Sequence, residues 1–176
     1  MNMGTKTRYY AVAAVTIDGF IARYPKHRGR WTSREDYRHL QEMENKADVL
    51  LLGRTTYEVA KKALSRRNCI VLTGRVKGIK KINDRLVYIN PKKASVEKFV
   101  KKNKYRKVCV LGGRGAYNYC LRKNLLDELW ITLEPLLFGS GIGMFSEGIV
   151  ERRMKLVSVK KLNKKGSLLL HYRKSK

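Results

Sequence analysis

Short apolar runs alternate with helical patterns through the first two thirds of the chain. The runs are rich in Val, Leu and Ile, and most end at a polar residue or a glycine, which is typical of buried strands. We predict these strands at residues 9–16, 20–22, 48–52, 69–73, 85–89 and 107–111. The predicted helices cover residues 33–46, 55–64, 94–103 and 115–123. This alternation indicates an α/β fold in which helices connect parallel strands.

The last third of the chain has a different pattern. Strand-like runs at residues 128–133, 156–161 and 167–173 follow one another without helices between them, and Lys164-Lys165-Gly166 is typical of a hairpin turn. Antiparallel strands added to a parallel sheet would explain this pattern. We therefore predict a single domain over residues 1–176, with 1–7 as a short leader. Its mixed sheet is mostly parallel, with antiparallel C-terminal strands, and about four helices flank it.

The composition narrows the cellular setting. The chain is 43% hydrophobic, but no apolar stretch is as long as a transmembrane helix, and the N-terminus lacks a secretory signal. Cys69, Cys109 and Cys120 are odd in number and lack CxxC spacing, which argues against a disulfide framework or a zinc site. We expect a cytoplasmic protein with reduced thiols, no membrane segment and no metal.

The charge is strongly positive, with 40 Lys and Arg against 14 Asp and Glu, a formal net charge of +26. Such a charge attracts anions and gives non-specific affinity for nucleic acid. Two interpretations are open: a general property of the host's proteins, or a basic nucleic-acid-binding protein. Basic pairs are spread along the chain without interleaved aromatic residues, which favours the first. We expect any nucleic-acid binding to be non-specific.

Two glycine-marked junctions carry the clearest chemical signal. In LLLGRTTYE (residues 50–58) and VLGGRGAY (110–117), an apolar run ends at glycine and a helical pattern begins. Helix N-termini bind phosphate, and glycine lets the phosphate approach the backbone. Two such junctions predict a ligand with several phosphates, such as a dinucleotide. The second is not a Rossmann fingerprint, because Asn118 stands where its last glycine would be.

Five segments in order resemble the dihydrofolate reductase fold family, which includes the reductase domain of bacterial riboflavin biosynthesis. These segments are AAVTIDGFIA, WTSRED, LLGRTTYE, VLGGRGAY and DELWITLEPLLFGSGIGMF. The resemblance runs over residues 9–172. It implies the family's fold and an NADPH-dependent hydride transfer, and it is more specific to the fold than to the reaction.

Trp31 and Asp36 keep the five-residue spacing of the substrate-binding tryptophan and acid in dihydrofolate reductases. Reduction of the pterin C6–N5 imine requires a protonated N5, which a partly buried carboxylate supports. Alternatively, Asp36 is simply a favourable acid in a helix first turn, which Glu35 would be equally well. The resemblance also implies that Thr132 bonds the acid and that Tyr117 lies near the nicotinamide. The implied catalytic residues are thus Asp36, Trp31, Thr132 and Tyr117.

The resemblance also implies a cofactor site for NADPH. Arg54 and Arg75 favour NADPH over NADH, because a guanidinium suits the 2′-phosphate, although Arg75 in so basic a chain could be a solvated turn residue. The implied cofactor-binding residues are Ala13, Ala14, Ile21, Gly53, Arg54, Thr55, Thr56, Thr73, Gly74, Arg75, Leu111, Gly112, Gly113, Arg114, Gly115 and Ala116.

The substrate is less sharply indicated. Riboflavin-type reductases usually carry a D-P-x-L-x-x-R run after the first cofactor loop and an acid before the second Gly-Gly, and both are absent here. Arg66 matches the arginine that binds the folate α-carboxylate, although KALS (62–65) replaces the usual Pro-Leu-Pro rim. The implied substrate-binding residues are Val12, Asp36, Leu40, Arg66 and Thr132.

We therefore expect reduction of 7,8-dihydrofolate to tetrahydrofolate. The alternatives are reduction of a ribosylaminopyrimidine phosphate or an unassigned NADPH reductase of this fold. The apolar, glycine-rich segment at residues 135–145 resembles the dimer-forming arm of thermophilic and riboflavin-type members, so we also expect a homodimer.

Overall fold

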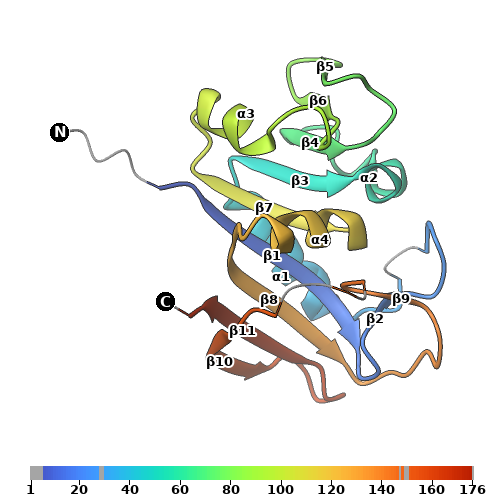
Figure 1. The fold of residues 1–176 in the computed structure, drawn as a ribbon. Helices are drawn as coiled ribbons and strands as arrows, with labels where there is room; N and C mark the ends of the chain where they lie inside the picture. The colour runs from blue at the N-terminus through green and yellow to red at the C-terminus, as the bar shows by residue number, and fades with distance from the viewer. Residues whose placement is uncertain (1–5, 28–29, 147, 149–150, 176) are drawn as a thin grey trace.

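The computed structural model describes residues 6–27, 30–146, 148 and 151–175 (Figure 1). A nine-stranded sheet runs through it in the order β10-β11-β8-β1-β7-β3-β4-β6-β5. Its strands are β1 (Arg8–Thr16), β3 (Val49–Gly53), β4 (Cys69–Leu72), β5 (Ile79–Lys81), β6 (Leu86–Ile89), β7 (Lys107–Gly112), β8 (Leu126–Glu134), β10 (Met154–Lys161) and β11 (Leu168–Lys174). The short strands β2 (Phe20–Ala22) and β9 (Ile142–Gly143) form a second sheet.

The strand directions confirm the predicted mixed sheet. The strands from β8 through β1, β7, β3 and β4 to β6 are parallel, whereas β11 and β10 are antiparallel additions at one edge. β5 and β9 were not predicted: β5 has the polar, exposed sequence Ile-Lys-Lys, and β9 is only two residues long. Most of the predicted leader lies outside the described residues.

Four helices flank the sheet in the described part of the chain, as predicted: α1 (Arg34–Asn45), α2 (Arg54–Ala60), α3 (Val96–Lys102) and α4 (Arg114–Arg122). Ser33 caps α1 by accepting a hydrogen bond from the backbone N–H of Asp36 at 3.2 Å. α2 ends at Ala60, four residues earlier than predicted, and the chain continues in turns.

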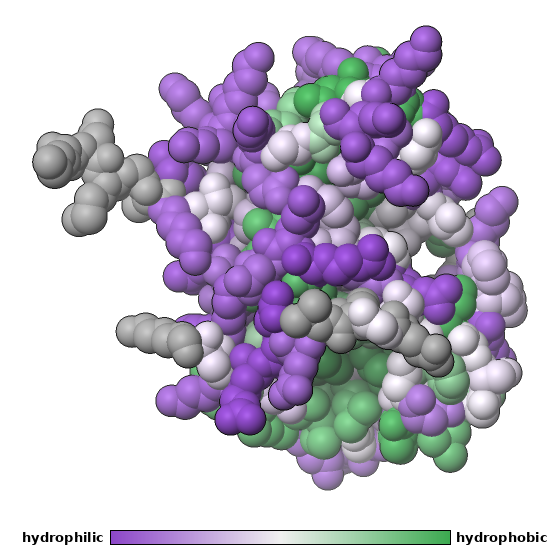
Figure 2. All heavy atoms as spheres, viewed as in Figure 1, coloured by the Kyte–Doolittle hydropathy of each residue, from purple (hydrophilic) through white to green (hydrophobic). Residues whose placement is uncertain are grey.

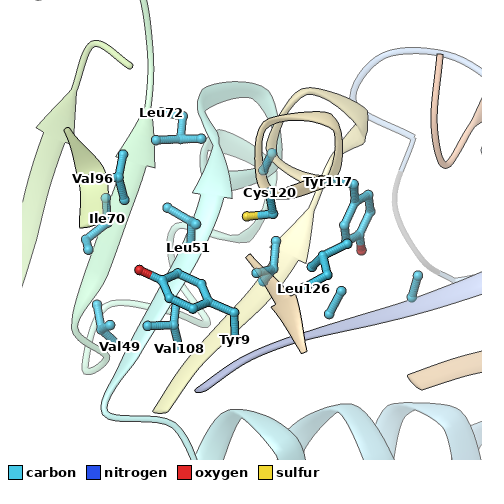
Figure 3. Close-up of a cluster of buried hydrophobic side chains, with 14 of the residues drawn as sticks. Tyr9, Val49, Leu51, Ile70, Leu72, Val96, Val108, Tyr117, Cys120 and Leu126 are labelled. Carbon is cyan, nitrogen blue, oxygen red and sulfur yellow. The ribbon is translucent and has the colours of Figure 1, made fainter. Parts of the chain in front are cut away.

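The core consists of two hydrophobic clusters, one on each face of the sheet. Because side chains alternate along a strand, Tyr9 and Ala11 join the cluster under α3 and α4, part of which Figure 3 shows. Tyr10 and Val12 join the other, under α1 and α2. Leu51 of the central strand β3 is fully buried. No described helix is long and apolar enough to cross a membrane.

The three cysteines are free and buried, as expected. Burial raises the pKa of Cys69 to about 12 and also raises the pKa values of Cys109 and Cys120, so these thiols are poorly reactive. No cluster of metal-ligating side chains occurs among the residues that the structure describes.

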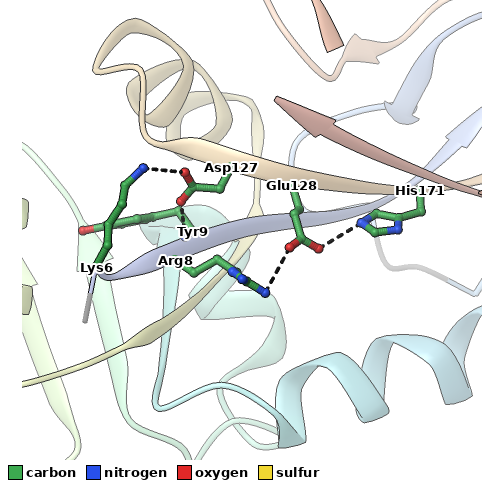
Figure 4. A network of polar contacts seen from close by, with 6 residues as sticks. All are labelled: Lys6, Arg8, Tyr9, Asp127, Glu128 and His171. Atoms are coloured by element: carbon green, nitrogen blue, oxygen red, sulfur yellow. Dashed lines mark hydrogen bonds and ion pairs between the residues drawn. The ribbon is translucent and has the colours of Figure 1, made fainter. Parts of the chain in front are cut away.

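A polar network holds β1, β8 and β11 together near the start of β1 (Figure 4). Glu128 on β8 contacts the Nη1 atom of Arg8 at 3.3 Å and the Nε2 atom of His171 at 2.9 Å. Asp127 accepts a hydrogen bond from the backbone N–H of Tyr9 at 2.9 Å. These contacts fix β8 beside β1, and the carboxyl end of β8 contributes to the site described next.

Candidate active site

The carboxyl ends of β1, β3, β4 and β7 meet at one edge of the sheet, where open α/β sheets bind their ligands. A cavity of about 1270 Å³ lies there and extends to the segment before α1 and to α1 itself. Pockets for a single drug-sized ligand measure roughly 300–1,000 Å³. The cavity is therefore large enough for a cofactor and a substrate together.

Nearly all predicted cofactor residues line this cavity; the exceptions are Gly112 and Ala116. Gly112 has φ +95°, and a Cβ atom there would lie 2.8 Å from the ring of Tyr117, so only glycine fits. A Cβ atom on Gly113 would lie 3.1 Å from Thr56 Oγ1, and one on Gly53 would lie 3.8 Å from Gly113 N. The structure thus brings the two glycine junctions side by side.

Basic side chains surround this end of the cavity. Arg54 forms an ion pair with Glu58, one turn later on α2. Arg75 and Arg114 also line the cavity, and neither forms an ion pair with any residue in the described part of the chain. They are therefore available to a negatively charged ligand.

Asp36 lies at the other end of the cavity, on the first turn of α1. It is 6% exposed and is the only acidic residue among the described residues of the lining. Burial raises the pKa of Asp36, and the nearby charge of Glu134 raises it further, while Thr132 and Thr32 oppose the shift. A carboxyl group with a raised pKa can hold and transfer a proton closer to neutral pH.

Thr132 is buried on β8, outside the cavity lining, on the side facing α1. It lies close enough to lower the pKa of Asp36, yet its hydroxyl makes no hydrogen bond of ordinary length and angle to a described residue. Thr132 therefore lies near the acid without forming the predicted hydrogen bond to it.

The predicted aromatic residues form the walls of the cavity. Trp31 lines it and packs edge-on against Phe138, with ring centroids 5.0 Å apart. Tyr117 also lines it, and its hydroxyl donates to the carbonyl oxygen of Val12 at 2.7 Å. Burial raises the pKa of Tyr117 far above its ordinary value, so the phenol remains protonated and continues to donate this hydrogen bond. Val12 and Leu40 complete the predicted lining.

Arg66 lies apart from the cavity, exposed in the turns after α2. Other basic residues, which the sequence analysis did not select, line the outer part of the cavity end that holds Asp36, called the substrate end below: Lys26, Arg30, Arg34 and Arg38. Arg34 and Arg38 are four residues apart and share one side of α1. In a chain with 40 Lys and Arg, this spacing could not be distinguished from other basic pairs.

The segment at residues 135–145 folds against its own chain. Its β9 pairs with β2, and Asp18 accepts hydrogen bonds from the backbone N–H groups of Phe138 and Gly139 at 3.0 and 2.7 Å. Phe138 also lies under the guanidinium of Arg23, 4.6 Å from the ring centroid. The predicted dimer arm therefore forms part of the wall around Trp31.

The sequence model of the family described as dihydrofolate reductase matches residues 9–134. The chain belongs to the dihydrofolate reductase family. The match begins in β1 and ends at Glu134, so it includes both glycine junctions, Trp31, Asp36 and Thr132. This confirms the resemblance and the fold inferred from the sequence.

Known relatives span several kinds of protein within the dihydrofolate reductase fold. The uncharacterized protein YwjB of Bacillus subtilis is 28% identical over 180 residues, which cover 97% of this chain and 98% of YwjB. The dihydrofolate reductase of Enterococcus faecalis, solved with NADP(H), has a TM-score of 0.66 and 22% identity over 96% of this chain and 97% of that one.

A bifunctional protein of Thermotoga maritima is also similar in structure. It is described as a diaminohydroxyphosphoribosylaminopyrimidine deaminase and 5-amino-6-(5-phosphoribosylamino)uracil reductase. Its TM-score is 0.73 at 21% identity, over 97% of this chain and 57% of that one. At these identities, the two solved structures establish the fold alone.

The residues present suit the nicotinamide cofactor that reductases of the dihydrofolate reductase fold use. Gly113 and Gly53 leave the backbone accessible between the two junctions, and Arg75 and Arg114 supply cations that no described acid neutralises. Ala13 and Ala14 at the end of β1 line the cavity with small side chains, which allow a flat ring to approach the strand.

Proposed function

We propose that this protein reduces 7,8-dihydrofolate to tetrahydrofolate with NADPH. The observation that carries the proposal is Asp36, a buried acid with a raised pKa and the only acidic residue among the described residues that line the cavity. Bound NADPH would supply a hydride for pterin C6. Asp36 would favour the protonation of pterin N5.

The residues at the cofactor end would bind and orient the dinucleotide. Arg75 and Arg114 would bind its phosphates, which favours NADPH because a guanidinium forms strong hydrogen bonds to a phosphate dianion. Gly113, packed against Thr56, would let the pyrophosphate approach the backbone. Tyr117 would hold Val12, and with it the end of β1, against the reacting rings.

The residues at the substrate end would bind the pterin and exclude water. Asp36 would accept hydrogen bonds from the pterin amide and amino groups, and its field would favour protonation of N5 through a water molecule. Trp31, held by Phe138, would border this water. Close packing of the two rings against Leu40 and Ile21 would supply the orientation that hydride transfer requires.

A second candidate substrate is a phosphorylated ribosylaminopyrimidine. The observation that favours it is the cluster of Lys26, Arg30, Arg34 and Arg38 at the outer substrate end, together with the position of Arg66 away from the cavity. The relative from Thermotoga maritima is described as acting on such a pyrimidine. The missing D-P-x-L-x-x-R run argues against it, so we place dihydrofolate first.

The deciding experiment follows the loss of NADPH absorbance with each substrate in turn, using the wild-type protein and the Asp36→Asn variant. Turnover with dihydrofolate that collapses in the variant would support the proposal. Turnover with the phosphorylated pyrimidine alone would transfer the assignment to the second candidate. Binding of NADPH without either activity would overturn both and leave a reductase of another substrate.

We also propose a homodimer, as the sequence suggested, but on a different surface. Side chains on one face of β8, β11 and β10 form an apolar surface beyond α4, which is visible below the basic side chains in Figure 2. It includes Ile131, Leu133, Leu168, Leu170 and Val159, and Val159 is 53% exposed. Two copies could cover this surface symmetrically. Sedimentation showing only monomer at micromolar concentration would overturn the homodimer.

A further inference from the structure

A second carboxylate lies buried behind the cavity, and nothing in the proposed reaction uses it. Glu134 is the last residue of β8 and is only 4% exposed. It stands two residues after Thr132, so both side chains point toward the α1 face of the sheet. It is not part of the cavity lining, so it does not reach the ligands directly.

The carboxylate of Glu134 accepts three hydrogen bonds. Its Oε1 atom accepts from the backbone N–H of Ser33 at 2.8 Å and from the Ser33 hydroxyl at 2.7 Å. Its Oε2 atom accepts from the Ser167 hydroxyl at 2.5 Å. An ionised carboxylate accepts hydrogen bonds and donates none, so three donors suit it.

Ser33 connects this carboxylate to Asp36. Because the Ser33 hydroxyl donates its proton to Glu134, the lone pairs of Ser33 Oγ are free to accept from the backbone N–H of Asp36 at 3.2 Å. One residue therefore separates Glu134 from the backbone of the acid. The contact with Glu134 fixes both the position of the helix cap and the orientation of its hydroxyl.

The C-terminal hairpin supports the same helix turn from a second side. The Nδ2 atom of Asn163, in the turn between β10 and β11, donates to Ser167 Oγ at 3.0 Å and to Glu35 Oε2 at 3.3 Å. The hairpin lies beyond the segment that the family model matches, which ends at Glu134. Contacts from outside that segment thus help to place the first turn of α1.

We propose that Glu134 is a positioning residue for Asp36. Glu134 holds the first turn of α1 through Ser33, and its negative charge, which lies behind Asp36, disfavours a second negative charge on Asp36. The proposal rests on the proposed function for the role of Asp36 as the acid. Both effects of Glu134 act through Asp36, since Glu134 does not line the cavity.

The surroundings of Asp36 agree with this electrostatic effect. Burial contributes most to its raised pKa, and the charge of Glu134 acts in the same direction. The hydroxyls of Thr132 from β8 and Thr32 before α1 act in the opposite direction, and the phenol of Tyr117, whose own pKa is raised by burial, also lies within electrostatic reach of Asp36. Removing the charge of Glu134 should therefore lower the pKa of Asp36.

Two variants separate charge from position. Glu134→Gln removes the charge and keeps an amide oxygen that can accept from Ser33, whereas Ser33→Ala keeps the charge and removes the cap. Glu128→Gln is the matched control, because Glu128 is a buried glutamate on the same strand and side but contacts Arg8 and His171 instead. Circular dichroism of each variant would establish that it folds.

The primary measurement is an NMR titration of the Asp36 side-chain carboxyl group in the protein without substrate. We expect Glu134→Gln to move the midpoint to lower pH and Glu128→Gln to leave it at the wild-type value. Ser33→Ala also removes a donor to Glu134, so it should not move the midpoint to lower pH. In turnover, Ser33→Ala should lower kcat by roughly tenfold without moving the pH profile to lower pH, because it misplaces the acid.

An unchanged Asp36 midpoint in a folded Glu134→Gln protein would overturn the electrostatic part of the proposal, and unchanged kcat in Ser33→Ala would overturn the positioning part. If Glu134→Gln does not fold, Ser167→Ala provides the test. It removes one donor to Glu134 and is expected to shift the Asp36 midpoint to higher pH, because the carboxylate is then less neutralised; no shift would count against the proposal. The titration requires no substrate, so its result stands whether or not dihydrofolate is reduced.

Discussion

The two ends of the cavity are built in different ways. The cofactor end consists of short contiguous segments, Gly53–Thr56, Thr73–Arg75 and Gly113–Gly115, each at or directly after the end of a strand. The substrate end combines Trp31 and Asp36 with residues from distant parts of the chain, Phe138 packed behind Trp31 and Thr132 behind Asp36. A dinucleotide site can be carried by local sequence, whereas the acid of the substrate site depends on distant neighbours.

The two ends also differ in electrostatics. Arg75 and Arg114 leave the cofactor end with unneutralised positive charge, while the substrate end places one buried acid behind an outer rim of arginines. Cations at the surface act on a ligand at almost any pH. A buried acid acts only over the range in which its protonation changes, so the pH dependence of the reaction should come from the substrate end.

The largest effect should come from Asp36→Asn, which tests the substrate end alone. We expect turnover near neutral pH to fall by roughly 10²- to 10⁴-fold, with a smaller loss at low pH, where the substrate can arrive protonated. The dissociation constant of NADPH, measured by fluorescence, should stay within about a factor of two of the wild type. A large loss of NADPH affinity would mean that the two ends are not independent.

Gly112→Ala tests the cofactor end. Its φ of +95° and the 2.8 Å approach to Tyr117 should together lower the free energy of unfolding. Backbone strain and overpacking each cost roughly 1–3 kcal/mol. Urea denaturation measures the loss. Gly115→Ala is the control, because nothing lies within 4 Å of its Cβ position and alanine is favoured in a helix by about 0.5–1 kcal/mol. Equal stability of both variants would contradict the close packing at Gly112.

Arg75→Ala tests whether the cofactor end of the cavity prefers NADPH to NADH. A hydrogen bond to a charged group contributes about 1.5–3 kcal/mol, so NADPH affinity should fall at least about tenfold while NADH affinity changes little. Isothermal titration with both cofactors measures this. Arg66→Ala should change neither, because Arg66 lies outside the cavity lining. An equal loss for NADH would exclude recognition of the 2′-phosphate by Arg75.

The smallest effect is the pH dependence of the free energy of unfolding that Asp36 causes. Because the pKa of Asp36 is raised in the folded state, the folded protein binds this proton more tightly than the unfolded chain does. Its contribution to stability is therefore lost as pH rises from the ordinary carboxyl range through the raised pKa. The Asp36→Asn variant does not lose stability in this way, because asparagine does not titrate. The free energy of unfolding of the variant, relative to wild type, should increase with pH across that window and then level off.

Urea denaturation of the two proteins over a pH series measures the difference. A difference that is constant with pH would contradict a raised pKa. If the difference increases with pH as expected, Asp36→Asn lowers activity but raises the free energy of unfolding at neutral pH. This is the trade-off expected when a site residue is buried at a cost to the stability of the fold.

Much of the fold could be predicted from local sequence. The apolar runs located every described strand except β5 and β9. The central strands were the clearest, because burial on both faces of the sheet requires continuous apolar residues. Asp36 could be found because its spacing from Trp31 is local. Glu134 could not, because nothing in the residues around it indicates that Ser33, some hundred residues away, will donate two hydrogen bonds to it. Arg66 was selected by a motif whose surrounding rim has changed.

The sequence by itself determined most of the helices and strands and the two glycine junctions, since each depends on residues close together in the chain, and it determined the net positive charge through composition alone. Only the tertiary structure decided which residues meet. β1 lies between β7 and β8, which brings the glycine junction after β7 to one side of the cavity and the carboxyl end of β8 to the other. The physical reason is that alternation specifies which face a side chain occupies, whereas strand order specifies which side chains share that face.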